Sequence, residues 1–375
     1  MQLTSLTLAA ISLAGVAVAH PGHDLSEEIA ERRAFVNSVE KRSLDHCAEK
    51  IKARGLEARN LARRSAAVKN ARAAKGLHKR DNDTWEESHN STCSGYSEYT
   101  PIPELFAGNA SCVLTPEVTQ GPYYVGGEYV RENVAEDQDG VEIHLDYQVI
   151  DVETCEPVPH VYVEMWHCNS TGVYSGVVAN GNGDSSDESN LDNTFLRGIQ
   201  PTDRDGVAQF ISTFPGHYTG RATHIHVMVH TNATLLANHT LGNEVYASHV
   251  GQAFFDQDLI TEVEKVEPYA SNTQDITLNA DDSILLQETA DVDPVMSYVY
   301  LGDSVEEGFF AWLAFGINTT YSGEVTPAAF LYESGGVENS DSGVGGPGRG
   351  APGGVPSGVP SGVPSGVPSE STPTV

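Results

Sequence analysis

Two histidines separated by one residue are the clearest candidates for chemistry in this chain of 375 residues. His224 and His226 lie in an apolar run with strand-like spacing, so both side chains are expected on one face, as adjacent ligands of one metal require. The same spacing also occurs in half-buried strands that bind no metal. No carboxylate stands in register with the pair, which argues against a ferrous site of two histidines and one carboxylate. The pair alone leaves both readings open.

Two further segments place aromatic residues beside turns. One runs Trp-His-Cys-Asn-Ser-Thr-Gly-Val-Tyr-Ser and puts Tyr174 after a glycine turn, at the end of a predicted strand. The other, residues 112–125, contains the Gly-Pro-Tyr-Tyr turn of residues 121–124. Taken separately, the first indicates a packing residue and the second a rigid turn that caps a sheet.

Together these segments resemble the intradiol ring-cleavage dioxygenase family, especially its secreted eukaryotic branch. The motifs occur in the family's order: Gly-Pro-Tyr-Tyr at 121–124, Trp-x-Cys-x-x-x-Gly-x-Tyr-Ser at 166–175, Asp-Arg-Asp-Gly at 203–206, and Pro-Gly-x-Tyr at 215–218 before an arginine and His-x-His. The resemblance runs from about Leu114 to Asp258 and more weakly to Tyr321, so it covers roughly half of the chain.

The resemblance implies a non-haem ferric ion, Fe(III), held by two tyrosinates and two histidines. On this chain the ligands would be Tyr174, Tyr218, His224 and His226. The donor types suit the metal, because hard, anionic phenolates favour Fe(III) over Fe(II) and imidazoles complete the shell without adding charge.

The resemblance also implies the reaction, in which O2 opens an aromatic ring between two hydroxyl-bearing carbons. Tyr218 would leave the metal as the diol binds, and Arg221 would stabilise negative charge that develops on the ring. The expected pocket residues are Gly121, Pro122, Tyr123 and Gln252. Catechol, hydroxyquinol and lignin-derived diols all remain open as substrates. The alternative functions are a catechol- or iron-binding module without turnover, and a zinc hydrolase, which lacks a third ligand in register.

Short alternating segments separated by Gly, Asn, Asp and Pro predict a mainly β fold, a β-sandwich over residues 112–321. The expected strands are Val141–Val149, Val158–His167, Val207–Phe214, Ala222–His230, Asp275–Leu278, Ile284–Leu286, Ser297–Leu301 and Phe309–Ile317. After residue 334 the repeated Gly-Val-Pro-Ser composition predicts a disordered tail, residues 335–375.

The N-terminal part indicates secretion. Residues 1–19 combine an apolar run with a small-residue cleavage site, as in a signal peptide, and no other segment could cross a bilayer. Glycosylation sequons begin at Asn82, Asn90, Asn109, Asn169, Asn232, Asn238 and Asn318. We therefore expect a secreted, extracellular protein with no membrane partner.

Charge divides the chain into two parts. Residues 20–80 hold 15 Lys and Arg against 8 Asp and Glu, whereas residues 81–375 hold 6 against 44. The acidic body argues against a nucleic-acid partner. The basic segment has helical spacing and ends at the dibasic pair Lys79-Arg80, before a Ser/Asn-rich linker, residues 81–111. A propeptide removed after Arg80 is the preferred interpretation; the alternative is a retained arm that packs on a partner subunit of a homodimer.

Five cysteines in a secreted chain favour disulfides over thiolate metal ligands. Closeness in sequence pairs Cys93 with Cys112 and Cys155 with Cys168, although other pairings remain open. This assignment leaves Cys47 without a partner.

Overall fold

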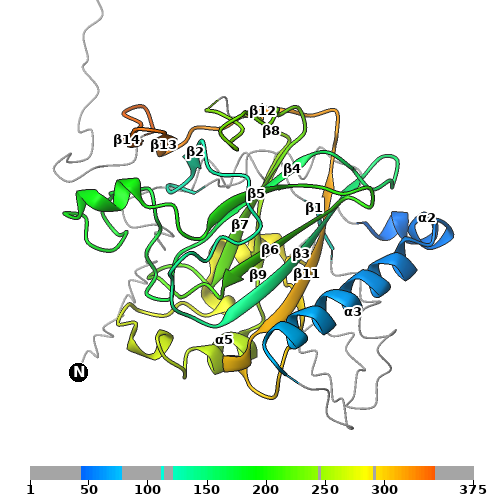
Figure 1. Cartoon of the computed structure of the whole chain (residues 1–375), viewed down its shortest axis with the longest axis horizontal. Coiled ribbons are helices and arrows are strands. Elements are labelled where there is room, and N and C mark those ends of the chain that lie inside the picture. Colours follow the sequence, from blue (N-terminus) through cyan, green and yellow to red (C-terminus); the bar gives the residue numbers. More distant parts are fainter. Residues whose placement is uncertain (1–43, 78–110, 114–120, 244–245, 290–292, 343–375) are drawn as a thin grey trace, which may run out of the picture.

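The described part of the chain is mainly β-structure, as predicted. The structure, a computed structural model, describes residues 44–77, 111–113, 121–243, 246–289 and 293–342 (Figure 1). Its elements are η1 (Asp45–Cys47), α2 (Ala48–Ala53), α3 (Leu56–Ala74), β1 (Ser111–Val113), β2 (Val125–Gly126), β3 (Glu142–Asp151), β4 (Tyr162–Trp166), η2 (Glu188–Asp192), β5 (Arg197–Pro201), β6 (Val207–Thr213), β7 (His224–His230), β8 (Tyr246–Ala247), β9 (His249–Phe254), α5 (Gln257–Val263), η3 (Tyr269–Ser271), η4 (Asn279–Asp281), α6 (Ser283–Glu288), β10 (Ser297–Tyr300), η5 (Val305–Glu307), β11 (Phe309–Ile317), β12 (Gly323–Glu324), β13 (Ala329–Tyr332) and β14 (Gly335–Glu338).

Two sheets enclose the main core. The first has the strand order β1-β11-β3-β6, with β10 also paired to β11, and the second has the order β5-β4-β7-β9. Strands β3 and β11 are parallel, whereas all pairs in the second sheet are antiparallel. Alternate side chains from both sheets, such as Leu145, Val227 and Leu313, meet in one apolar cluster. The predicted β-sandwich is therefore confirmed.

The alternation along β7 decides where the candidate ligands lie. Ile225, Val227 and Val229 point into the core between the sheets. His224 and His226 therefore lie on the opposite face, because successive strand side chains alternate. Every residue of β7 is nevertheless buried, since a second cluster that includes Tyr123, Trp166, Tyr174 and Tyr218 lies outside the second sheet.

Helix α3 runs alongside β3 and β11 and covers the outer face of the first sheet (Figure 1). Val68 and Ala71 of the helix pack against Phe310 and Trp312. Its buried face also carries polar residues, which meet polar partners on β3. These pairs are Asn60 with Gln148, and Arg63 and Arg64 with Asp146.

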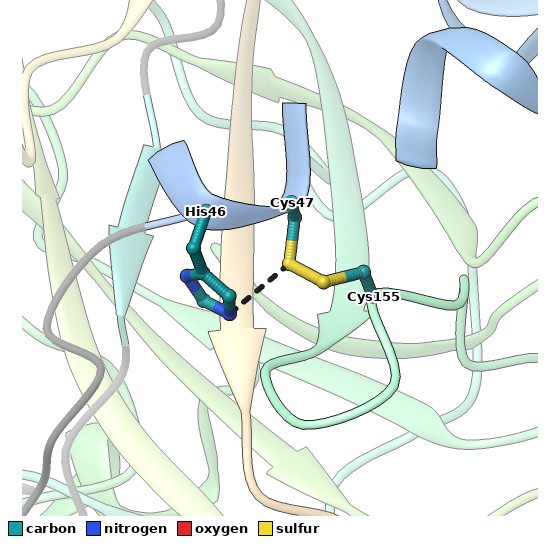
Figure 2. A group of neighbouring side chains, drawn as sticks. All are labelled: His46, Cys47 and Cys155. Carbon is teal, nitrogen blue, oxygen red and sulfur yellow. Dashed lines mark hydrogen bonds between the residues drawn. A yellow bond between two sulfur atoms is a disulfide. The ribbon is translucent and has the colours of Figure 1, made fainter. Parts of the chain in front are cut away.

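The predicted Cys155–Cys168 disulfide is wrong. Cys155 is bonded to Cys47, 108 residues away (Figure 2). Cys168 is a buried free thiol that contacts the Gly216 carbonyl. Cys47, which the predicted pairing left without a partner, therefore has Cys155 as its disulfide partner. The other predicted pair involves Cys93, which lies outside the described residues. His46 lies close to both sulfurs, but these are bonded to each other and offer no thiolate for a metal.

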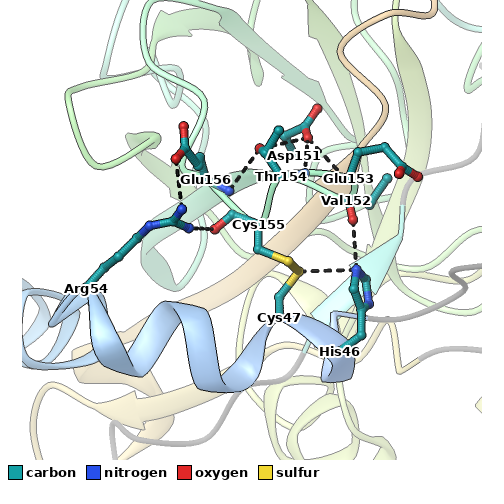
Figure 3. Close-up of a disulfide and its surroundings, with 9 residues drawn as sticks. All are labelled: His46, Cys47, Arg54, Asp151, Val152, Glu153, Thr154, Cys155 and Glu156. Atoms are coloured by element: carbon teal, nitrogen blue, oxygen red, sulfur yellow. Dashed lines mark hydrogen bonds and ion pairs between the residues drawn. A yellow bond between two sulfur atoms is a disulfide. The ribbon is translucent and has the colours of Figure 1, made fainter.

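Polar contacts flank this disulfide on both sides (Figure 3). The His46 ring donates to the Val152 carbonyl at 2.7 Å, and Arg54 donates to the Cys155 carbonyl at 2.6 Å and to Glu156 at 2.8 Å. Residues 44–77 are therefore bound to the sandwich of their own chain by a covalent bond and by packing.

Removing the Cys47–Cys155 disulfide is expected to destabilise the protein by about 4 kcal/mol, because a cross-link over about 100 residues strongly restricts the unfolded chain. Urea denaturation of the Cys47→Ala/Cys155→Ala variant measures the loss. Mapping of unreduced peptides should join Cys47 to Cys155 and leave Cys168 free; a Cys155–Cys168 peptide would contradict this pairing.

The disulfide also bears on maturation. Cleavage after Arg80 stays a prediction, but a chain cut there would keep residues 44–77 attached through Cys47. Intact mass before and after reduction should then show one species converting into two.

Two predicted strands and one boundary differ from the structure. Ile284–Leu286 belong to helix α6, and residues 275–278 form no strand. The predicted tail begins at residue 335, yet Gly335–Glu338 form β14 and pair with β13. Residues 343–375 lie outside the described part. None of the helices in the described ranges has the length and apolar content needed to span a membrane.

Candidate active site

Strand β7 directs both histidines to one point. His224 Nδ1 lies 2.6 Å from the Ala222 carbonyl oxygen, which can only accept, so Nδ1 carries the proton and Nε2 offers its lone pair. The Nε2 atoms of His224 and His226 are 3.1 Å apart. Trp166 of β4 stacks on the His226 ring at a centroid distance of 4.9 Å. Neighbouring groups thus fix both ring orientations.

The two tyrosines reach the same place from separate loops. The Tyr218 hydroxyl lies 3.4 Å from His224 Nε2. The ring of Tyr174 lies 5.7 Å from that of Tyr218 and 6.1 Å from that of His226, between centroids. Gly172, at a φ of +81°, makes the turn before Tyr174, and a Cβ there would lie 3.1 Å from the Tyr218 Cβ. The structure therefore brings the four predicted ligands together.

Electrostatics suit this cluster to a cation. Burial and, to a lesser extent, the Arg221 charge lower the pKa of His224 to about 3, so the imidazole is neutral at pH 7. Burial also raises the pKa of the Tyr174 and Tyr218 phenols above their ordinary value. The buried Tyr174 hydroxyl makes no hydrogen bond of normal geometry among the described residues. One neutral imidazole, a second histidine and two phenols are donors that fit a ferric ion, whose charge would ionise the phenols.

Arg221 and Gln252 lie together beside the cluster. Arg221 is fully buried, and its Nη2 donates to Gln252 Oε1 at 2.5 Å. Gln252 belongs to β9, where it pairs with His226 of β7. Arg221 Nη1 and Gln252 Nε2 are both buried without a hydrogen-bond partner in the described part of the chain. These two donors are available to an oxygen atom of a bound molecule.

The predicted pocket turn contacts the same cluster. Gly121 has a φ of +72°, and a Cβ there would lie 2.9 Å from His226 Cε1, so only glycine fits. The Tyr123 ring packs on Tyr174 at 5.0 Å. Pro122 lies between Gly121 and Tyr123 in the sequence, is half-buried, and completes the turn.

Sequence reasoning missed two groups that support the site. Asp282 is fully buried and forms an ion pair with Arg221, with 2.9 Å between Nε and Oδ2. Arg197 donates from Nη2 to the carbonyls of Tyr123 and Ser175 at 2.7 Å, beside two rings of the cluster. Asp282 lies beyond the motifs, and nothing in its local sequence distinguishes it from a helix cap.

Comparisons with known proteins agree with the motifs. Residues 119–275 match the model of the family described as "Dioxygenase". A catechol 1,2-dioxygenase of Pseudomonas sp. (strain EST1001) is 42% identical over 66 residues, which are 16% of this chain and 22% of that protein. The match thus spans about a fifth of the curated relative.

Solved structures are also similar. An intradiol ring-cleavage dioxygenase from Tetranychus urticae is 27% identical, with a TM-score of 0.45, over 56% of this chain and 96% of its own. A dioxygenase domain from Streptomyces sp. SirexAA-E is 21% identical, with a TM-score of 0.34, over 53% and 94% of the two chains. The family model over residues 119–275 and the curated relative confirm that this chain resembles the intradiol ring-cleavage dioxygenases.

Proposed function

We propose that this protein is an extracellular ferric dioxygenase that cleaves aromatic vicinal diols between the two hydroxyl-bearing carbons. The observation that carries the proposal is the buried convergence of Tyr174, Tyr218, His224 and His226 beside the Arg221 guanidinium. The presence of all four ligands together with Arg221 favours an enzyme, because a module that had lost turnover should have lost at least one of them. Both atoms of O2 would enter the product.

A ferric ion held by these four residues would supply the electron-withdrawing centre that activates a bound diol for attack by O2. The protein's own groups do the rest. Tyr218 would hold the metal as a tyrosinate, and because burial raises the pKa of its phenol, this tyrosinate is suited to take a proton from the incoming diol. Arg221 Nη1 and Gln252 Nε2 are donors for oxygen atoms that gain negative charge. Burial of the cluster excludes water from the developing charge.

Secretion is part of the proposal and rests on residues 1–19, the sequons and the disulfide. The sequon residues Asn232 and Asn238 are both exposed, as attachment of a glycan requires. A disulfide between Cys47 and Cys155 favours an oxidising compartment. Residue-level mapping of glycans on protein from the culture medium tests this location.

Product identity tests the reaction. The purified protein is incubated with catechol, hydroxyquinol and protocatechuate under isotopically labelled O2, and products are analysed by mass spectrometry. We expect a ring-opened dicarboxylate, of the cis,cis-muconate type from catechol, that carries both labelled oxygens. A yellow semialdehyde would show cleavage outside the diol and overturn the proposal. Diol binding without any product across the panel would favour the binding module.

A further inference from the structure

We propose that Asp282 is a positioning residue that fixes Arg221 for the reaction. This inference rests on the proposed function, in which Arg221 meets charge on the substrate. Asp282 makes no hydrogen bond to the four candidate ligands or to the unpartnered Nη1 of Arg221, although its charge acts on nearby His224. We infer that its main effect on the reaction passes through Arg221.

The Asp282 carboxylate binds two elements at once. Its Oδ2 accepts from Arg221 Nε at 2.9 Å and from the Ala222 backbone N–H at 2.7 Å. Its Oδ1 accepts from the backbone N–H groups of Ile284 and Leu285, at 2.8 and 2.9 Å, and so caps helix α6. Each carboxylate oxygen thus accepts two hydrogen bonds, and the side chain is fully buried. The carboxylate therefore has one defined orientation.

This arrangement leaves one nitrogen of the Arg221 guanidinium, Nη1, available to donate a hydrogen bond to a bound molecule. Nε binds Asp282, Nη2 binds Gln252, and Nη1 is buried without a partner among the described residues. A guanidinium is planar, so fixing Nε and Nη2 also fixes the direction of Nη1. A donor held in place before the reaction stabilises developing charge better than one that must reorient.

A helix cap alone does not explain Asp282. Asp256 caps helix α5 in a similar way, with its side chain accepting from the Leu259 N–H at 2.7 Å, and it is also buried. Asp282 additionally binds the Arg221 guanidinium of the candidate active site. The two aspartates thus form a matched pair of caps, and their comparison isolates the contacts of Asp282 with Arg221 and the Ala222 N–H.

The experiment compares Asp282→Asn with Asp256→Asn. Asparagine caps helices as well as aspartate does, so α5 and α6 are expected to persist. If the amide oxygen of the introduced side chain at position 282 caps α6, its NH2 group faces Arg221 Nε and the Ala222 N–H, and both contacts are lost. We expect Asp282→Asn to lower kcat by about 10-fold or more with little change in KM, and Asp256→Asn to leave kcat within about twofold.

A double-mutant cycle identifies the route of the effect. Arg221→Ala is expected to lower kcat by about 100-fold or more. If Asp282 acts through Arg221, the double variant should be no slower than Arg221→Ala alone, because the second change removes nothing further. Additive losses would overturn the inference, as would an unchanged kcat in Asp282→Asn.

A readout other than activity separates this inference from the proposed function. Iron content and the visible spectrum of resting Asp282→Asn should equal those of the wild type, whereas the spectrum of bound nitrocatechol should shift as it does in Arg221→Ala. Loss of iron would show that Asp282 supports the ligands instead, and would overturn the inference. If Asp282→Asn does not fold, Asp282→Ser, which keeps a capping hydroxyl, replaces it. An inactive wild type with iron would instead contradict the proposed function.

Discussion

Tyr174→Phe is expected to abolish the colour of the protein and to lower its affinity for Fe(III) by more than about 100-fold. The change removes one oxygen atom and keeps the ring, so its packing against Tyr123 and Tyr218 remains. Changes to groups that merely support a metal ligand already cost about 10- to 100-fold in affinity, and loss of an anionic ligand should cost more. Metal analysis and the visible absorption of the purified variant measure both effects.

Tyr147→Phe is the matched control. Tyr147 is also fully buried, and its hydroxyl likewise makes no hydrogen bond among the described residues, but it lies in the core between the sheets. This variant should keep the iron and the colour. His226→Ala should lose both, as Tyr174→Phe does. Zinc in the wild type, or iron retained in both site variants, would show that the ligand assignment is incorrect.

The sequence predicts several strands of the two sheets. Strands β3, β6, β7, β10 and β11 all fall within expected ranges or within two residues of them, because β3 alternates apolar and polar residues and the others are short runs between turn residues. Side chains along a strand alternate between its two faces. The same period places His224 and His226 on one face of β7. The position of Tyr174 and Tyr218 next to them rested on the resemblance, since no local pattern shows that two separate loops meet.

One wrong expectation has a local cause, whereas the others involve partners far apart in the sequence. Ile284–Leu286 are apolar enough for a strand, but Asp282 caps the segment and starts helix α6. Cys47 pairs with Cys155 because residues 44–56 pack beside the end of β3, which spacing along the chain cannot reveal. Asn60 and Arg64 are polar residues on the buried face of α3, and they become favourable there only because β3 presents Gln148 and Asp146. Such complementarity exists only once both elements are folded together.

That complementarity predicts a large effect on stability. Asp146 is fully buried and receives two hydrogen bonds from Arg63, each 2.9 Å long, with Arg64 at 3.4 Å. Asp146→Ala leaves the buried Arg64 and the largely buried Arg63 without this anion. Breaking a buried ion pair by removing one partner typically costs about 3–5 kcal/mol. We expect a loss of this size in urea denaturation, together with looser attachment of α3, measured by faster amide exchange in residues 56–74.

The pH dependence of a related variant, Asp146→Asn, tests whether charge is responsible. Burial alone would raise the pKa of Asp146, but the hydrogen bonds from Arg63 and the charges of Arg63 and Arg64 hold it below its ordinary value. A carboxyl with a lowered folded-state pKa stabilises the protein above its unfolded pKa of about 3.9, and this stabilisation disappears as pH falls through the folded-state pKa. The difference in unfolding free energy between wild type and Asp146→Asn should therefore be constant from pH 7 to about pH 5 and shrink below about pH 4.

The control variant is Asp205→Asn, which breaks the more exposed ion pair with Arg59 and should lower the unfolding free energy by no more than about 1 kcal/mol. Equal losses from the two changes would mean that packing, and not the buried charge pair, holds α3 on the sheet.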